Sequence, residues 1–189
     1  MTRWNQFRLE KLTELSTVCK DVLDIGQSAR HDKRLFNRIN YTTFDLDPTL
    51  EPDILGDICD MGMIRDGSYD GIVCCAILEH VYAPWRAVRE MGRVTRDGGK
   101  LFGYVPFLYP YHAKEGHYSD YYRYTAEGIE YLFGKEGGFR GIEICPVRGN
   151  VTTLLNLMPY VGRTQGLFAW LDGFFSNRQV SGYFFYCEK

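Results

Sequence analysis

The stretch Lys20 to Asp47, KDVLDIGQSARHDKRLFNRINYTTFDLD, decides the fold. It begins with a short apolar run, Val22 to Ile25, that stops at Gly26. A run of this length ending in glycine is typical of a buried strand in a parallel sheet. A second strand is predicted over Tyr41 to Phe44, and it ends at an acid, Asp45.

The segment between these two strands, His31 to Ile39, is basic and spaces three apolar residues to line one face of a predicted helix. A strand, a turn, a helix and a strand with an acid at its tip form a dinucleotide-type unit. Gly26 and Asp45 are 19 positions apart, close to the roughly 20 expected between a glycine turn and the carboxylate that binds a ribose.

The turn after the first strand indicates which ligand is plausible. A dinucleotide site uses G-x-G-x-x-G, because the second glycine lets the backbone approach a pyrophosphate and the third lets helix and strand pack closely. Here the sequence is GQSAR, and Gly26 is the single glycine of the turn. A nicotinamide oxidoreductase is therefore disfavoured. A ligand without phosphates, with an adenosine ribose and a small amino-acid tail, makes weaker demands on this loop.

At this turn the chain resembles the class I S-adenosylmethionine-dependent methyltransferases, whose first motif usually reads D-x-G-x-G-x-G. Asp24 and Gly26 match that motif, whereas Ser28 and Arg30 stand where two further glycines are usual. Ser28 is a small replacement. Arg30 adds a long charged side chain that either turns to solvent or pairs with the ligand carboxylate.

The resemblance continues beyond a third strand, predicted near Asp53 to Leu55. In the family, an acid at the following turn contacts the adenine amino group and the next apolar residue packs on the ring, which Asp57 and Ile58 match. The alternative is a turn aspartate that bonds to its own backbone, as is common in Gly-Asp turns.

The most specific match is the run DGSYDGIVCCAILEHV, which resembles the family's fourth strand, here Tyr69 to Ala76, and the start of the next helix. The resemblance implies a site for S-adenosylmethionine, with S-adenosylhomocysteine as the product. The residues it implies for that site are Asp24, Gly26, Gln27, Ser28, Asp45, Leu46, Asp57, Ile58, Cys75 and Ala76.

The same resemblance implies an α/β fold: a Rossmann-like, doubly wound, seven-stranded and mostly parallel sheet with an antiparallel last strand and helices on both faces. Helices are predicted from the residue pattern over Trp4 to Val18, Pro84 to Val94 and Ala126 to Lys135. The first helix either covers the cofactor or substrate or simply packs against the sheet. The last strand, Gly182 to Glu188, is expected between the fifth and sixth strands.

A long aromatic loop over residues 107–124 follows the predicted fifth strand, Leu101 to Val105. Loops of this length are usually functional or disordered, and the aromatic content argues against disorder. Because the loop leaves the carboxyl end of a strand, it should overhang the crevice where open α/β sheets bind ligands. We interpret it as a substrate lid. Some bacterial methyltransferases of this type carry a similar H-x-x-D-x-x-R-Y-T run, matched here from His117 to Thr125.

Three histidines are candidate catalytic bases: His80 at the expected active edge, and His112 and His117 in the lid. For His80, a structural contact is the alternative. A metal site made by His112, Glu115, His117 and Asp120 is also conceivable, since two histidines and a carboxylate can bind iron or zinc. Their spacing is not that of a regular ligand pair, so a hydrogen-bonded network that orders the lid is favoured, and no metal is assigned.

Composition fits one domain over residues 1–189, with the lid and an apolar cap over 150–176 as insertions. The cap is either a cover for the substrate pocket or a homodimer surface. The chain is 45% hydrophobic and 24% charged, with a net charge of −2, so nucleic-acid partners are not favoured. Six cysteines without a C-x-x-C pair indicate a reduced, cytoplasmic protein. No signal peptide or membrane span is expected.

The resemblance therefore implies an S-adenosylmethionine-dependent methyltransferase, which we expect to act on a small molecule or a sugar-containing intermediate. Because the sulfonium is already a reactive donor, catalysis rests mainly on in-line alignment and the exclusion of water. A base matters where the acceptor is protonated. The alternative is a non-catalytic protein of the same fold that uses the pocket as a binding surface. Ser28 and Arg30, which replace two usual glycines, are the reason to consider it.

Overall fold

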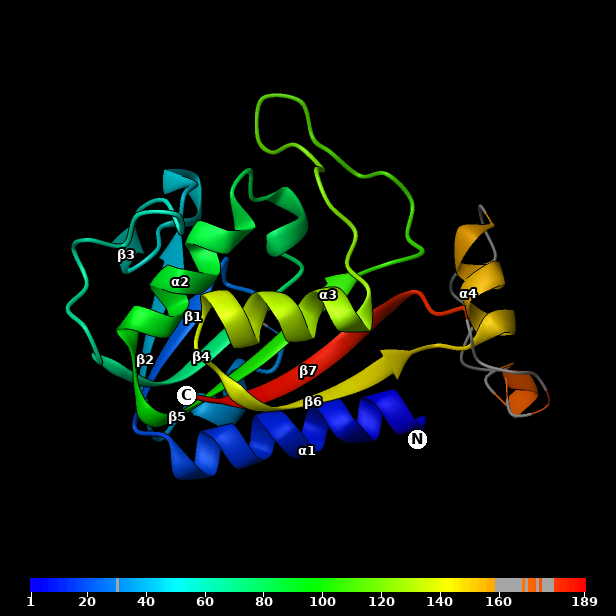
Figure 1. The fold of residues 1–189 in the computed structure, drawn as a ribbon, viewed down its shortest axis with the longest axis horizontal. Helices are drawn as coiled ribbons and strands as arrows, with labels where there is room; N and C mark the ends of the chain where they lie inside the picture. The colour runs from blue at the N-terminus through cyan, green and yellow to red at the C-terminus, as the bar shows by residue number, and fades with distance from the viewer. Residues whose placement is uncertain (30, 159–167, 169, 173, 175–178) are drawn as a thin grey trace.

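The computed structural model describes residues 1–29, 31–158, 168, 170–172, 174 and 179–189. One seven-stranded sheet organises the chain (Figure 1). Its strands are β1 (Asp21–Ile25), β2 (Asn40–Asp45), β3 (Ile54–Leu55), β4 (Tyr69–Cys75), β5 (Thr95–Pro106), β6 (Arg140–Val147) and β7 (Gly182–Glu188). The α-helices of the described residues are α1 (Arg3–Val18), α2 (Pro84–Val94), α3 (Ala126–Tyr131) and α4 (Asn150–Leu157).

The strand order is β3-β2-β1-β4-β5-β7-β6. β1 pairs in parallel with β2 and β4, and β4 pairs in parallel with β5. β7 lies between β5 and β6 and runs antiparallel to both. This arrangement confirms the predicted doubly wound, mostly parallel sheet and the place of its last strand.

Side chains that alternate along each strand divide the core into two layers. In β1, Leu23 and Ile25 belong to the layer that contains the buried residues of α2 and α3, whereas Val22 belongs to the layer that contains Leu12 and Leu15 of α1. Figure 1 shows α1 along one side of the sheet and α2 and α3 along the other. Helices on both faces, which the sequence predicts, are thus confirmed.

The predicted first and second helices are also confirmed. α1 covers the predicted range within one residue, and α2 begins at Pro84 and ends at Val94 as expected. Proline at the first helical position costs nothing there, because its missing N–H would have no partner in the helix. Among the described residues, no helix has the length and apolar character needed to cross a membrane.

The predicted helix over His31 to Ile39 is wrong. The structure has one short 3-10 helix there, Lys33–Phe36, joined to its surroundings by turns. Two reasons are visible: the turn after β1 occupies the chain as far as Ala29, and the next turn closes from the Asp32 N–H onto the Ala29 oxygen at 2.8 Å. Little chain is left before β2 for a full helix. Phe36 is the buried residue of this short 3-10 helix.

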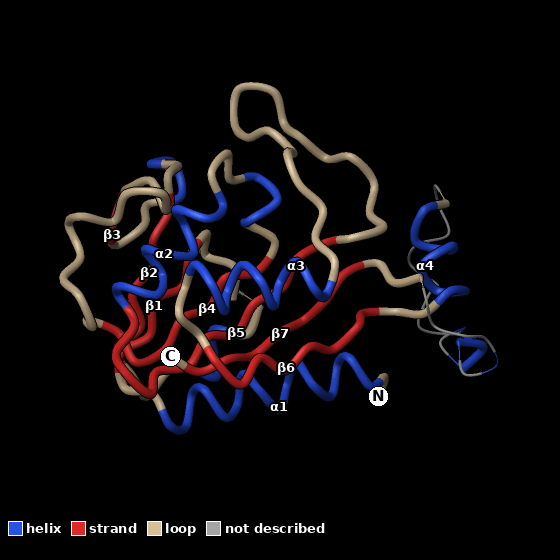
Figure 2. Tube along the Cα trace, in the orientation of Figure 1, coloured by secondary structure: helices blue, strands red, loops and turns tan. Residues whose placement is uncertain are grey.

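Residues 107–124 leave the end of β5 as a long loop without helix or strand, drawn in tan in Figure 2. One isolated bridge, between Lys114 and Tyr118, closes its tip. Within the predicted cap over 150–176, α4 is described, but residues 159–167, 169, 173 and 175–176 lie outside the described part of the chain. The choice between a pocket cover and a dimer surface therefore stays a prediction.

Gly103 in β5 tests the packing of the core layer beneath α2 and α3. It is paired with Phe185 of β7, and a Cβ at Gly103 would lie 2.1 Å from the Phe185 Cζ. Because the ring is fully buried and cannot move aside, we expect Gly103→Ala to lower the free energy of unfolding by about 1–3 kcal/mol, measured by urea denaturation.

Gly134→Ala is the matched control, because its Cβ would meet nothing closer than 3.9 Å, at Ile142 Cδ1. Residue 134 lies in the π-helix Leu132–Glu136 that continues α3, so that variant should be unchanged or more stable by up to about 1 kcal/mol, as expected for alanine in a helix. Equal stability of Gly103→Ala and the unaltered protein would contradict the packing described here.

Candidate active site

The carboxyl ends of β1, β2 and β4 lie side by side in the centre of the sheet. From β1 the chain builds outward to β2 and β3 on one side, then returns to form β4 and β5 on the other. Open α/β sheets bind ligands at such a reversal, outside the carboxyl ends of the strands. Most of the residues implied for cofactor binding lie at the ends of these three strands or on the turns that leave them.

The turn after β1 has a backbone conformation that favours glycine. Gly26 has φ +72° and Gln27 has φ +46°. A Cβ at Gly26 would lie 2.0 Å from Ile77 Cδ1, so a larger residue has no room. The Gly26 N–H donates to the Phe44 oxygen at 2.7 Å, which joins this turn to the end of β2. Arg30 lies outside the described residues, and its two expected orientations stay predictions.

Asp24 is fully buried, and its carboxylate shapes the turn from within. It accepts hydrogen bonds from the Ser28 N–H and hydroxyl, both at 2.9 Å, from the Ala29 N–H at 3.2 Å and from the Tyr41 hydroxyl. Burial raises the pKa of Asp24, and the hydrogen bonds act in the opposite direction. Ser28 also accepts the Cys75 N–H at 3.0 Å, so these contacts join β1, β2 and β4.

Asp45 stands half-buried at the tip of β2. One carboxylate oxygen accepts the Asp47 N–H at 2.9 Å, and the other has no hydrogen-bond partner among the described residues. Gln27 reaches past this strand end, where its side-chain N–H donates to the Leu50 oxygen at 2.7 Å. Leu46 is largely exposed. An available carboxylate oxygen beside a left-handed turn fits a ligand that presents ribose hydroxyls.

Asp57 makes the local contact that the sequence left open as the alternative. Its carboxylate accepts the Cys59 N–H at 2.8 Å and the Tyr82 hydroxyl at 3.0 Å. Ile58 is buried in the core layer of α2 and α3. Both carboxylate oxygens of Asp57 are thus engaged within the protein, and its contact with an adenine stays a prediction.

Cys75 and Ala76 complete the third strand end. Cys75 is half-buried, and burial raises the pKa of its thiol well above the usual range. Ala76 is exposed with φ +56°, and its N–H donates to the Tyr104 oxygen at 2.9 Å. This left-handed residue turns the chain sharply out of β4 and directs it toward the 3-10 helix η3 (Leu78–His80).

Two of the three candidate bases come together at η3. The rings of His80 and His112 lie edge to face with centroids 4.8 Å apart. Burial lowers the pKa of His80. His117 does not join them: it lies at the lid tip with its Nδ1 3.9 Å from an oxygen of Asp47.

Glu79 is the residue that the sequence analysis missed. Its side chain is 1% exposed, and burial raises its pKa to about 7. Its Oε1 lies 3.8 Å from the Nε2 of His80 and 3.8 Å from the Nε2 of His112. An acid next to a candidate histidine was a visible signal, but the approach of His112 depends on how the lid folds back.

The lid is fastened to η3 by its backbone. The backbone N–H groups of Tyr121 and Tyr122 donate to the backbone carbonyl oxygen of Glu79 at 2.7 and 3.2 Å. The Tyr124 hydroxyl donates to the backbone carbonyl oxygen of Leu78 at 2.9 Å. These bonds hold the return arm of the lid against the strand end. The return arm of the lid therefore lies beside η3, the segment that follows β4.

The four residues weighed as a metal set do not come together. His112 does meet Asp120, with Nδ1 3.2 Å from Oδ2, but His117 lies beside Asp47 and Glu115 is exposed. Asp120 instead pairs with Arg123, which holds the pKa of that carboxyl far below its usual range. This pair and His112 form the hydrogen-bonded network that was expected to order the lid.

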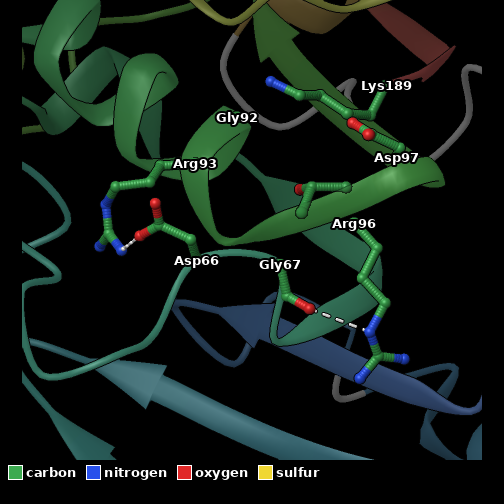
Figure 3. Close-up of a pocket in the computed structure, with 8 residues that line it drawn as sticks. Asp66, Gly67, Gly92, Arg93, Arg96, Asp97 and Lys189 are labelled. Carbon is green, nitrogen blue, oxygen red and sulfur yellow. Dashed lines mark hydrogen bonds and ion pairs between the residues drawn. The ribbon is translucent and has the colours of Figure 1, made fainter.

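A surface depression at the opposite ends of β4 and β5 is a different feature (Figure 3). It is lined by residues that include Asp66, Gly67, Arg93 and Arg96. Arg93 donates to Asp66 at 2.7 Å, and Arg96 donates to the Gly67 oxygen at 2.9 Å. Both guanidinium groups are thus already paired, and the depression lies at the amino ends of the strands, away from the candidate residues.

Comparisons with known proteins agree with the fold. A family model described as a methyltransferase domain matches residues 23–103. Over 52 residues the chain is 40% identical to the human (Homo sapiens) thiol S-methyltransferase TMT1B. That match covers 28% of this chain and 21% of the human protein, so it spans about a fifth of that relative's length.

Solved structures extend the likeness to the whole fold. An S-adenosylmethionine-dependent methyltransferase from Archaeoglobus fulgidus superposes with a TM-score of 0.67 at 14% identity, over 98% of this chain and 93% of that one. The phosphoethanolamine N-methyltransferase 2 of Haemonchus contortus, in complex with S-adenosyl-L-methionine, gives 0.60 at 17% identity, over 98% and 52%.

The matched residues 23–103 run from β1 to the middle of β5, and they include the turn after β1, the tip of β2 and the end of β4. The strand order and the antiparallel β7 complete the same architecture outside the matched region. Residues 23–103 therefore match a methyltransferase domain, and the chain has the fold of solved S-adenosylmethionine-dependent methyltransferases.

Proposed function

We propose that the protein transfers a methyl group from S-adenosylmethionine to a small molecule or a sugar-containing intermediate. One observation carries the proposal: Asp45 keeps a carboxylate oxygen available at the tip of β2, beside the left-handed turn at Gly26 and Gln27. A carboxylate in this place suits the two hydroxyls of a ribose. The turn carries one glycine and no phosphate-binding loop, which suits a ligand without phosphates.

When bound, S-adenosylmethionine supplies an electrophilic methyl group on a sulfonium. The methyl group forms a bond to the acceptor as its bond to sulfur breaks, and the electron pair of that bond stays on sulfur. The chain's own residues orient the two reactants and exclude water, which accounts for most of the expected rate enhancement. Where the acceptor carries a proton, His80 or His112 is placed to accept it. His117 is exposed and stands apart from them.

The lid supports a compact acceptor. Its return arm is bonded to η3 at Glu79, and its outgoing arm brings His112 beside His80. We propose that residues 107–124 cover the acceptor and keep water from the reacting atoms. A reducing compartment such as the cytoplasm is supported by the six cysteines, all of which are free and five of which are buried.

A non-catalytic binding protein of the same fold is the second candidate. The observation that favours it is that Ile77 packs so close to the turn at Gly26 that even a Cβ at Gly26 would have no space. Calorimetry separates the candidates. Micromolar binding of S-adenosylmethionine and S-adenosylhomocysteine without binding of NAD supports the enzyme, whereas binding of none of the three supports the scaffold.

Asp45→Ala tests the ribose contact. Hydrogen bonds to a charged group contribute about 1.5–3 kcal/mol, so we expect affinity for S-adenosylhomocysteine to fall about 10- to 100-fold. Isothermal titration calorimetry measures the change. Asp66→Asn is the matched control: its exposed carboxylate pairs with Arg93 at the opposite end of the sheet, and its affinity should equal that of the unaltered protein. Equal affinity of both variants would remove Asp45 from the site.

Gly26→Ala tests the turn. The new Cβ would meet Ile77 Cδ1 at 2.0 Å in a backbone conformation with φ +72°, so we expect both a lower melting temperature and weaker binding of S-adenosylhomocysteine. Gly138→Ala shares the positive φ, +69°, but meets only the flexible end of Lys189 at 3.3 Å. It should lose about 1–2 kcal/mol of stability and keep its affinity. Equal losses of affinity in both variants would mean that the effect is not local.

A further inference from the structure

We propose that Glu79, His80 and His112 form a binding site for one divalent transition-metal ion, with Zn²⁺ as the best-matched species. One ligand atom from each residue lies within 4.8 Å of the other two. The Nε2 atoms of both histidines face the same carboxylate oxygen, Glu79 Oε1, each at 3.8 Å. Two of the ligands come from η3 and the third from the lid, so the site exists only when the lid is folded back.

The other ring nitrogen of each histidine is already held. The Nδ1 of His80 lies 2.7 Å from the Ser119 oxygen, and the Nδ1 of His112 lies 3.0 Å from the Pro110 oxygen. A carbonyl oxygen can only accept, so we assign the proton of each neutral ring to Nδ1. Each Nε2 then presents a lone pair toward Glu79. Metal-binding histidines are typically held in this way, by a carbonyl or carboxylate on the far nitrogen.

Glu79 makes the cluster unusual. Its side chain is 1% exposed, and its Oε2 is buried without a hydrogen-bond partner in the described part of the chain. A buried carboxylate oxygen without a partner is costly. The three converging groups offer acceptor atoms and, with the assigned tautomers, no donor among themselves. A cation satisfies all three at once, whereas a proton on Glu79 satisfies one contact at a time.

The surroundings do not oppose a cation. Arg123, a cation that acts electrostatically on Glu79, is paired with both carboxylate oxygens of Asp120. Asp120 also lies 3.2 Å from His112 Nδ1, behind the ring and on the side away from Glu79 Oε1. This carboxylate would make the imidazole a stronger ligand.

The donor set indicates the class of ion. Two imidazoles and one carboxylate are ligands of catalytic zinc and of non-haem iron, while Mg²⁺ and Ca²⁺ prefer oxygen. A tetrahedral zinc with bonds of about 2.0–2.1 Å holds its ligand atoms roughly 3.3 Å apart. The separations of 3.8 to 4.8 Å therefore need a contraction that small rotations of the three side chains supply.

Three protein ligands leave a coordination position open for a small molecule. The site borders the end of β4, so this position is suited to a hydroxyl or carboxylate of the methyl acceptor. This last step rests on the proposed function, and the binding of the ion does not. An ion bridging η3 and His112 would also fix the lid in its folded-back position.

The chain of residues 1–189, stripped with a chelator and dialysed, tests the site. Calorimetry with Zn²⁺ should give one ion per chain. Co²⁺ should give visible absorption typical of nitrogen and oxygen ligands without a thiolate charge-transfer band, which excludes the cysteines. His80→Gln, His112→Gln and Glu79→Gln should each weaken binding about 10- to 100-fold. His31→Gln, which removes an exposed histidine outside the cluster, should bind as the unaltered protein does.

Thermal melting of each variant shows whether it is folded, and Zn²⁺ should raise the melting temperature of the unaltered protein but not of His112→Gln. The proposal would be overturned if the unaltered protein did not bind Zn²⁺, or if the cluster variants bound it as tightly as the unaltered protein does. A protonated Glu79 would then be the better account of the cluster. Binding of S-adenosylhomocysteine is measured in the same samples with chelator present. If the unaltered protein binds Zn²⁺ but not S-adenosylhomocysteine, the result counts against the proposed function and not against the metal site.

Discussion

The buried carboxylate of Asp24 is the interaction on which the arrangement of the site depends. It receives two backbone N–H groups from the turn, the Ser28 hydroxyl and the Tyr41 hydroxyl. A charge buried in this way is tolerated only when hydrogen bonds replace the lost water. The bonds come from the turn after β1 and from β2, so they fix the position of Gly26 relative to Asp45.

Ser28 extends the same network to β4. A glycine is usual at this position in the family, and a glycine would supply neither the hydroxyl that donates to Asp24 nor the oxygen that accepts the Cys75 N–H. The departure from the glycine-rich pattern therefore has a structural function of its own. A loop fixed by side-chain bonds can keep the strand ends in place without the close backbone approach that glycines permit. Ser28 alone is not evidence of a degenerate site.

Much of the fold could be predicted because it follows from local patterns. The apolar runs of β1 and β4, the proline at the start of α2 and the alternation that separates the two core layers are all visible in the sequence. The helix over His31 to Ile39 could not be judged in this way. Its apolar spacing was helical, but the length of the preceding turn depends on the contacts of Asp24, which are tertiary.

The candidate site divides in the same way. Gly26 and Asp45 are recognisable as candidates because they stand at strand ends with the expected spacing along the chain. Glu79 is not, because its burial and the approach of His112 arise from a lid that begins 28 positions later. Asp57 shows the converse limit of sequence-based prediction. Its position predicts a contact with the ligand, but both of its carboxylate oxygens accept hydrogen bonds within the protein.

The two halves of the site are held by different kinds of contact, and this has a mechanical consequence. The turn residues are bonded directly to neighbouring strands, so they share the rigidity of the sheet. The half at η3 depends on the bonds from Tyr121 and Tyr122 to the Glu79 backbone and on the bond from the His112 N–H to Asp120. The lid and Glu79 are therefore positioned by the same few hydrogen bonds. Any group that binds between His112 and Glu79 stabilises the folded lid, and a lid that opens also separates those ligands. For the proposed metal site, occupancy of the cluster and closure of residues 107–124 are in this way one equilibrium.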